Sequence, residues 1–154
     1  MRYLLIDKIT DWRPGREATA IKNVSLTEDF FDDHFPMKPI MPGTLILEGM
    51  AQLAGLLLEA GVREDSGRNI KALMSMVDKA KFRSPARPGD SLEYHAEVLS
   101  VNELGGSVRT QAFCRGERIA ESSLIYSFHE FDNPLLEERQ GKLLRMWKQG
   151  LSGE

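Results

Sequence analysis

Cysteine is almost absent from this chain of 154 residues, which contains a single one, Cys114. One thiol excludes an internal disulfide and a cysteine-based zinc site, so nothing in the cysteine content points to an oxidising compartment. An excess of basic residues is lacking as well, because 20 Lys and Arg stand against 23 Asp and Glu, for a formal net charge of −3. Without a global positive field, a nucleic-acid partner is not expected.

The N-terminus lacks a long hydrophobic run. Its short apolar stretch, residues 4–6, is followed at once by Asp7 and Lys8. This stretch is too brief and too charged for a signal peptide or a membrane anchor, so we expect a cytoplasmic protein without a membrane span. The length suits one domain, and 42% hydrophobic residues is a usual content for a soluble globular fold.

One segment is apolar on every face. Residues 44–60 read TLILEGMAQLAGLLLEA. Only three of these side chains are strongly polar: Glu48, Gln52 and Glu59. With Pro42-Gly43 directly before it, the segment is predicted to be a buried core helix, since a membrane-spanning helix needs roughly 20 mostly apolar residues. Gly61 is predicted to cap this helix, and residues 63–69 to form a loop.

Strand patterns lie on both sides of the predicted helix. The expected strands are residues 3–9, 17–24, 70–82, 91–103, 107–115 and 118–128. In the second of them, Lys22 falls on the same side as the apolar Ala18, Ala20 and Val24. Short glycine-containing turns at 12–15, 87–90, 104–106 and 115–117 separate the strands, and the last three are predicted to form antiparallel hairpins. Together with a predicted amphipathic helix at 134–149, this pattern indicates an α+β fold in which an antiparallel sheet surrounds one helix.

Glu48 and Gln52 are the first candidate site residues. Because they are four residues apart on a helix, their side chains can touch. Burying a carboxylate in an apolar environment costs several kcal/mol unless it is protonated or hydrogen-bonded. Gln52 can supply only part of the hydrogen bonding that Glu48 needs. Glu48 is therefore either a functional acid or a structural carboxylate paired with a Lys or Arg of the sheet.

His34 and the helix start are the other candidates. His34 lies in an irregular loop ahead of the helix, where catalytic side chains are common, although a single histidine proves little. The first N–H groups of the helix, directly after Pro42, can hold an oxygen that gains negative charge, or Pro42-Gly43 can simply begin the helix. The other two histidines, His95 and His129, are expected to be solvated or structural, and Cys114 to be a small buried residue.

The segment DHFPMKPIMPGTLILEGMAQ closely resembles the active-site segment of the FabZ-type 3-hydroxyacyl-acyl carrier protein dehydratases, whose pattern runs HFPxxPxMPGxLxxExxAQ. The match has no gap. It includes His34, Phe35, Pro36, Pro39, Met41, Pro42, Gly43, Leu45, Glu48, Ala51 and Gln52. Further similarity extends over most of residues 3–128. Met37 stands where the family commonly has glycine.

The resemblance implies a hotdog fold, with a long central helix wrapped by an antiparallel sheet, over residues 1–132, and a helical extension over 133–154. It also implies a homodimer, or a hexamer built from three dimers, with active sites at the dimer interface. Each site would combine His34 of one subunit with Glu48 of the other. A Glu at this position is typical of the FabZ branch, whereas the related FabA branch carries Asp.

The reaction implied is removal of water from a (3R)-3-hydroxyacyl thioester carried by the phosphopantetheine arm of an acyl carrier protein. His34 would be the base and Glu48 the acid. The substrate would be bound by Gly43, Gln52, Phe35 and Pro42, and no metal or redox cofactor is required. Two alternatives stay open: a hotdog thioesterase, which does not need the histidine, and a non-catalytic acyl-binding subunit. Candidates for binding the acidic carrier are Lys38, Lys79, Lys81, Arg83 and Arg87.

Overall fold

A computed structural model describes residues 3–32, 37–130 and 132–151. His34 and Phe35 therefore lie outside the described residues. The elements in chain order are β1 (Lys8–Arg13), β2 (Glu17–Asn23), the 3-10 helix η1 (Asp29–Phe31), α1 (Gly43–Ser66), β3 (Ile70–Phe82), β4 (Ser91–Val101), β5 (Gly105–Cys114), β6 (Glu117–Glu130) and α2 (Pro134–Trp147).

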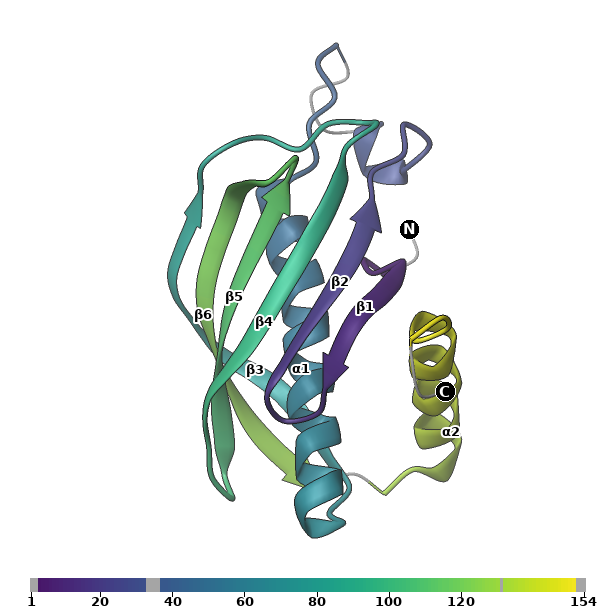
Figure 1. Ribbon diagram of the computed structural model, residues 1–154, viewed down its shortest axis with the longest axis vertical. Coiled ribbons are helices and arrows are strands. Elements are labelled where there is room, and N and C mark those ends of the chain that lie inside the picture. The colour runs from purple at the N-terminus through teal and green to yellow at the C-terminus, as the bar shows by residue number, and fades with distance from the viewer. Residues whose placement is uncertain (1–2, 33–36, 131, 152–154) are drawn as a thin grey trace.

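The six strands form one antiparallel sheet in the order β1-β2-β4-β5-β6-β3, curved around α1 (Figure 1). This confirms the predicted α+β hotdog arrangement, and β4-β5 and β5-β6 are the predicted hairpins. The hairpin predicted at residues 87–90 is wrong, because β3 pairs with β6 at one edge while β4 pairs with β2. The turn is instead part of a crossover between strands that are not neighbours.

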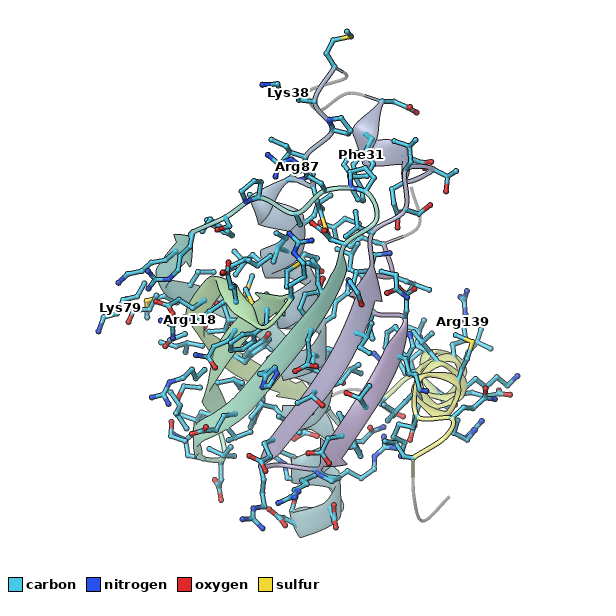
Figure 2. The ribbon with its side chains drawn as sticks, turned by 45° about the horizontal axis from the view of Figure 1, so that its top comes forward. Phe31, Lys38, Lys79, Arg87, Arg118 and Arg139 are labelled. Atoms are coloured by element: carbon cyan, nitrogen blue, oxygen red, sulfur yellow. The ribbon has the colours of Figure 1, made fainter. Side chains whose placement is uncertain are left out.

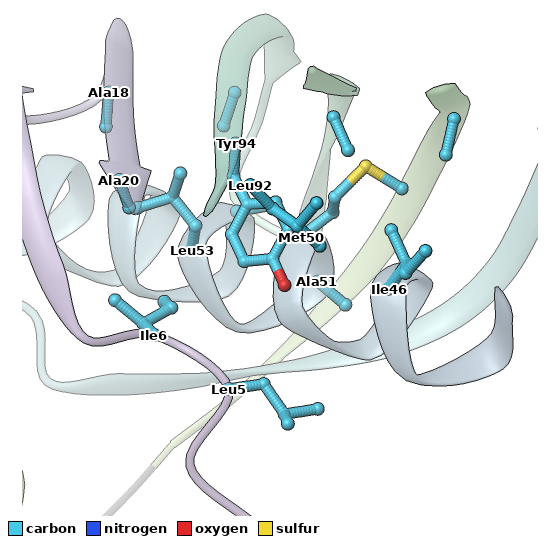
Figure 3. Packing of buried hydrophobic residues seen from close by; sticks show 14 of the residues in the cluster. Leu5, Ile6, Ala18, Ala20, Ile46, Met50, Ala51, Leu53, Leu92 and Tyr94 are labelled. Atoms are coloured by element: carbon cyan, nitrogen blue, oxygen red, sulfur yellow. The ribbon is translucent and has the colours of Figure 1, made fainter. Parts of the chain in front are cut away.

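The core lies between α1 and the concave face of the sheet (Figure 3). Apolar side chains on one face of α1, among them Met50 and Leu53, pack against sheet residues such as Leu92 and Tyr94. These four side chains are at most 1% exposed. Although α1 is long and apolar enough to cross a membrane, 61% of its most apolar window is buried inside the fold. Its composition is explained by its place in the core.

Helix α1 is longer than predicted. It continues through Gly61 to Ser66, and Gly67, with φ of 71°, caps it by donating its N–H to Arg63 O at 2.8 Å. Gly61 is needed for another reason: a Cβ at this position would lie 2.4 Å from the Cα of Gly15. The β1-β2 turn therefore packs directly on the helix backbone, a role that a glycine can fill without ending the helix.

The N-terminal segment also differs from the prediction. Residues 3–6 are not a strand, and β1 covers residues 8–13, including two residues predicted as turn. Leu5, at 2% exposure, is nevertheless part of the core. In β2 the predicted alternation is confirmed, because Lys22 is buried on the inner face, where its Nζ lies 2.6 Å from Glu28 Oε1.

The two edges of the sheet differ. Helix α2 contacts the β1 edge, and its Trp147 is only 4% exposed. Among the described residues no further strand pairs with the β3 edge, although α1 contacts the start of β3. Large apolar side chains are exposed along β3: Leu73, Met74, Met76, Val77 and Phe82. An uncovered apolar edge strand is a template for pairing with another chain.

Candidate active site

Glu48 is held by Gln52, and Gln52 is held by the N-terminal segment. Gln52 Nε2 donates to Glu48 Oε1 at 3.3 Å and to the carbonyl of Tyr3 at 2.8 Å, while its Oε1 accepts from the Leu5 N–H at 3.1 Å. These bonds define which end of the amide faces Glu48. The predicted contact between the two side chains is confirmed, and the segment before β1 supplies the orientation.

If Glu48 were a structural carboxylate, it would need a Lys or Arg partner from the sheet. Throughout residues 3–32, 37–130 and 132–151, no Lys or Arg pairs with Glu48, and its hydrogen bond from Gln52 is the only one. The side chain is half-buried. A half-buried carboxyl with one neutral hydrogen-bond partner is available for proton transfer.

The start of α1 provides unpaired backbone donors. Pro42 is the N-cap, and its carbonyl accepts from Leu45 N–H at 2.9 Å, while its side chain makes no capping bond. Within the described part of the chain, the N–H groups of Gly43 and Thr44 have no acceptor. A Cβ at Gly43 would lie 3.0 Å from the ring of Phe82, so glycine allows β3 to approach the helix start.

The predicted base, His34, and the predicted substrate contact Phe35 fall outside the described residues. The chain on either side is anchored at the end of the molecule where α1 begins (Figure 1). Phe31 of η1 is 6% exposed, and Met41 donates its N–H to Ala86 O at 2.8 Å. Phe31 and Met41 are thus buried residues on the two sides of the undescribed stretch.

A pocket of about 320 Å³ begins at Glu48. Its near part is lined by Leu4, Ala51, Gln52 and Tyr126, whose hydroxyl donates to Ala51 O at 2.7 Å. The pocket is also lined by residues that sequence reasoning missed: Glu59, Lys71, Leu143 and Trp147. The spacing from Gln52 to Glu59 places both on one helix face and could have indicated Glu59. Burial raises the pKa of Tyr126, and the nearby Glu48 and Glu59 add to this.

The profile of the family described as FabA-like domains matches residues 1–128. The chain belongs to the FabA-like family. It is 42% identical over 125 residues to the 3-hydroxyacyl-[acyl-carrier-protein] dehydratase FabZ of Nitratiruptor sp., covering 79% of this chain and 84% of that one. It is 44% identical over 125 residues to the FabZ dehydratase of Chlamydia trachomatis, covering 80% and 81%.

A solved structure has a similar fold. The dehydratase heterocomplex ApeI:P from Xenorhabdus doucetiae matches with a TM-score of 0.67 and 15% identity, covering 90% of each chain. At that identity the likeness shows the hotdog fold alone. The family match ends before α2.

The basic candidates of this FabA-like chain fall into two groups (Figure 2). Lys38 and Arg87 lie at the end of the molecule that carries Phe31. Lys79 and Lys81 of β3 line a shallow pocket together with Arg109 and Arg118, which the sequence analysis did not single out. Arg83 and Arg118 both bond Glu121, at 2.9 and 2.8 Å. We call Lys79, Lys81, Arg83 and Arg118 the basic flank.

The remaining histidines and the cysteine lie away from the pocket at Glu48. His95 contacts Glu93 and the ring of Phe113 on the outer face of the sheet. His129 bonds Ser127 at the end of β6. Cys114 is a free, buried thiol. Cys114 is buried, as predicted, and neither His95 nor His129 lines the pocket at Glu48.

Proposed function

We infer that this chain dehydrates (3R)-3-hydroxyacyl thioesters to trans-2-enoyl thioesters, with the acyl group on an acyl carrier protein. The observation that carries the proposal is the Glu48 carboxyl, oriented by Gln52 at a pocket and unpaired with any cation of the described residues. The relatives named as FabZ dehydratases support the same activity.

In the proposed reaction, His34 removes a proton from the carbon beside the thioester carbonyl, and Glu48 protonates the hydroxyl group on the next carbon. The C–O bond breaks, water leaves, and a double bond forms between the two carbons. Enolate charge develops on the thioester oxygen, which the Gly43 N–H can stabilise. Gln52 holds the Glu48 carboxyl in place but does not touch the substrate's reacting atoms.

We propose a homodimer in which the β3 strands of two subunits pair. The exposed apolar residues of β3 support this arrangement, because they would be buried by a second copy of the strand. Bulges interrupt the β3-β6 register between Met74 and Met76 and between Asp78 and Lys81. Such bulges bend an edge strand and restrict the registers in which it can pair.

We propose the basic flank as the docking surface for the acidic carrier. Phe82, which lies between Lys81 and Arg83 in the sequence, packs on Gly43, so the flank adjoins the helix start. Charge reversal of Lys81 should raise KM for a carrier-linked substrate and leave a small thioester analogue unaffected. Arg139→Glu, on α2 at the opposite side of the molecule (Figure 2), is the matched control. Equal effects on both substrates would assign Lys81 a structural role.

The decisive experiment measures two products from one reaction. Purified protein is incubated with a 3-hydroxyacyl carrier-protein thioester, and enoyl thioester and free thiol are followed together. Dehydration yields enoyl product without thiol, whereas a thioesterase yields thiol and an acyl-binding subunit yields neither. His34→Ala and Glu48→Gln should each lower kcat/KM by about 10² to 10⁴, the contribution of general acid-base catalysis.

Mixing subunits tests whether each site is shared. In a dimer of one His34→Ala subunit and one Glu48→Gln subunit, one site has both lesions and the other has neither. With free exchange of equal amounts, half the dimers are mixed, so roughly a quarter of wild-type activity should return. No recovery, with exchange confirmed by tagged subunits, would show that His34 and Glu48 act within one subunit.

A further inference from the structure

The pocket at Glu48 follows one face of α1 toward its C-terminal half. Glu48, Gln52, Gly55 and Glu59 all line it, at the spacing of successive turns on one helix face. At 1.5 Å per residue, Glu48 and Glu59 are about 16 Å apart along the axis. An acyl chain whose thioester lies at Gly43 and whose hydroxyl lies at Glu48 would therefore extend toward Glu59.

The far end of this pocket is polar. Glu59 Oε1 accepts from the Ala72 N–H at 3.0 Å and lies 3.3 Å from Lys71 Nζ. The Glu59 side chain is only 14% exposed, and burial raises the pKa of its carboxyl even though Lys71 lowers it. Both of these contacts are made by Oε1, and in the described part of the structure no protein group bonds Oε2, which is not fully buried. A carboxylate oxygen that lines the pocket without a protein donor can accept a hydrogen bond from a ligand.

Helix α2 forms one wall of the pocket. Its residues Gln140, Leu143 and Trp147 line it. An ion pair between Arg63 of α1 and Glu137 of α2, at 3.2 Å, ties the two helices together. Helix α2 lies beyond the residues that the FabA-like profile matches.

A plain alkyl chain and a chain with a polar end differ in what they do to Glu59. A methyl end that reaches Glu59 displaces water from the carboxylate and offers no hydrogen bond in return, which is unfavourable. A hydroxyl at the same place donates to Oε2 and can accept from Lys71, which keeps protons beyond the one directed to Glu59. The pair therefore discriminates between two chains of equal length.

We propose that Glu59 and Lys71 form a specificity subsite for a neutral hydrogen-bonding group, such as a hydroxyl, at the far end of an acyl chain of roughly twelve carbons. The subsite rests on the proposed dehydratase function, since it assumes that the acyl chain occupies this pocket. It disfavours an unsubstituted chain of the same length.

The test compares carrier-protein thioesters of 3-hydroxybutanoate, 3-hydroxydodecanoate and 3,12-dihydroxydodecanoate. We expect the wild type to prefer the 12-hydroxylated chain over the plain twelve-carbon chain by about tenfold in kcat/KM, the effect of one buried hydrogen bond. The double variant E59L/K71M should lose or reverse this ratio, because both polar groups become apolar. The control E138L/K142M removes an exposed pair of the same residue types on α2 and should keep the wild-type ratio.

The outcomes separate the two proposals. Failure of the wild type to dehydrate the four-carbon substrate, which is too short to reach Glu59, would overturn the dehydratase function. Dehydration of that substrate with equal kcat/KM for the two twelve-carbon chains would overturn the subsite alone. Retention of the preference by E59L/K71M would also overturn it, and if that variant does not fold, the wild-type ratio and the milder E59Q variant decide.

Discussion

Replacing Gln52 with alanine removes the one side chain that bonds Glu48 among the described residues, and it removes two hydrogen bonds between the N-terminal segment and α1. The bond to the Tyr3 carbonyl is exposed, so water replaces it at little cost. The Leu5 N–H belongs to a residue only 2% exposed, and leaving it without an acceptor costs about 1–3 kcal/mol. Alanine recovers a few tenths of a kcal/mol in helix propensity. We expect a net loss of about 1–2 kcal/mol in the free energy of unfolding.

Two measurements check this prediction. For a chain of this length, the loss corresponds to a Tm lower by roughly 2–8 °C. Activity should fall by about tenfold in kcat with little change in KM, since Glu48 stays in place but loses its orientation. Gln149→Ala, an exposed glutamine beyond α2, is the control and should change neither. A kcat as low as that of Glu48→Gln, or an unchanged Tm, would refute the assigned role of Gln52.

Three further predictions concern the fold. Gly49→Ala should destabilise the protein by about 1–3 kcal/mol in urea unfolding, because its Cβ would lie 2.4 Å from the hydroxyl oxygen of the buried Tyr94. Tyr94→Phe removes a hydroxyl that has no partner among the described residues, so it should be neutral or stabilising. In combination with Gly49→Ala, it should reduce the loss of stability. Desolvation raises the pKa of Asp90, but hydrogen bonds from the Arg87 N–H and from Arg115 outweigh it and lower this pKa below its usual value. Asp90→Asn should therefore lower the urea midpoint at pH 7. The difference from the wild type should shrink as the pH falls through the lowered pKa. Met76→Lys on the β3 edge should shift the protein toward monomer in analytical ultracentrifugation at unchanged helix content, and an unchanged mass would place the subunit interface elsewhere.

Local sequence patterns predicted most elements because they depend on neighbouring residues. The apolar run after Pro42-Gly43 is a helix, β3 has its predicted bounds of residues 70–82, and the alternation in β2 correctly placed Lys22 on the inner face. The contact between Glu48 and Gln52 follows from helical spacing and is present. Each of these features is determined by the short-range geometry of helix or strand.

Features that depend on distant segments were not predictable in this way. A glycine at position 61 is typical of a helix end, but Gly61 lies inside α1, where the close approach of Gly15 leaves no room for a Cβ. The glycine turn at 87–90 indicated a hairpin, but β3 pairs with β6 at the other edge of the sheet. Likewise, only the folded structure shows that the backbone of Tyr3 and Leu5, before β1, bonds Gln52.

The amino-acid sequence was enough to predict most of the elements, the α+β class and the family, because periodicity, turn residues and an ungapped motif are all local. The contact between Glu59 and Lys71 and the packing of α2 along the pocket that begins at Glu48 are seen only in the folded structure. The reason is physical: burial and hydrogen bonding between Glu59 and the start of β3 arise only when the helix packs on the sheet, and no pattern of neighbouring residues encodes that contact.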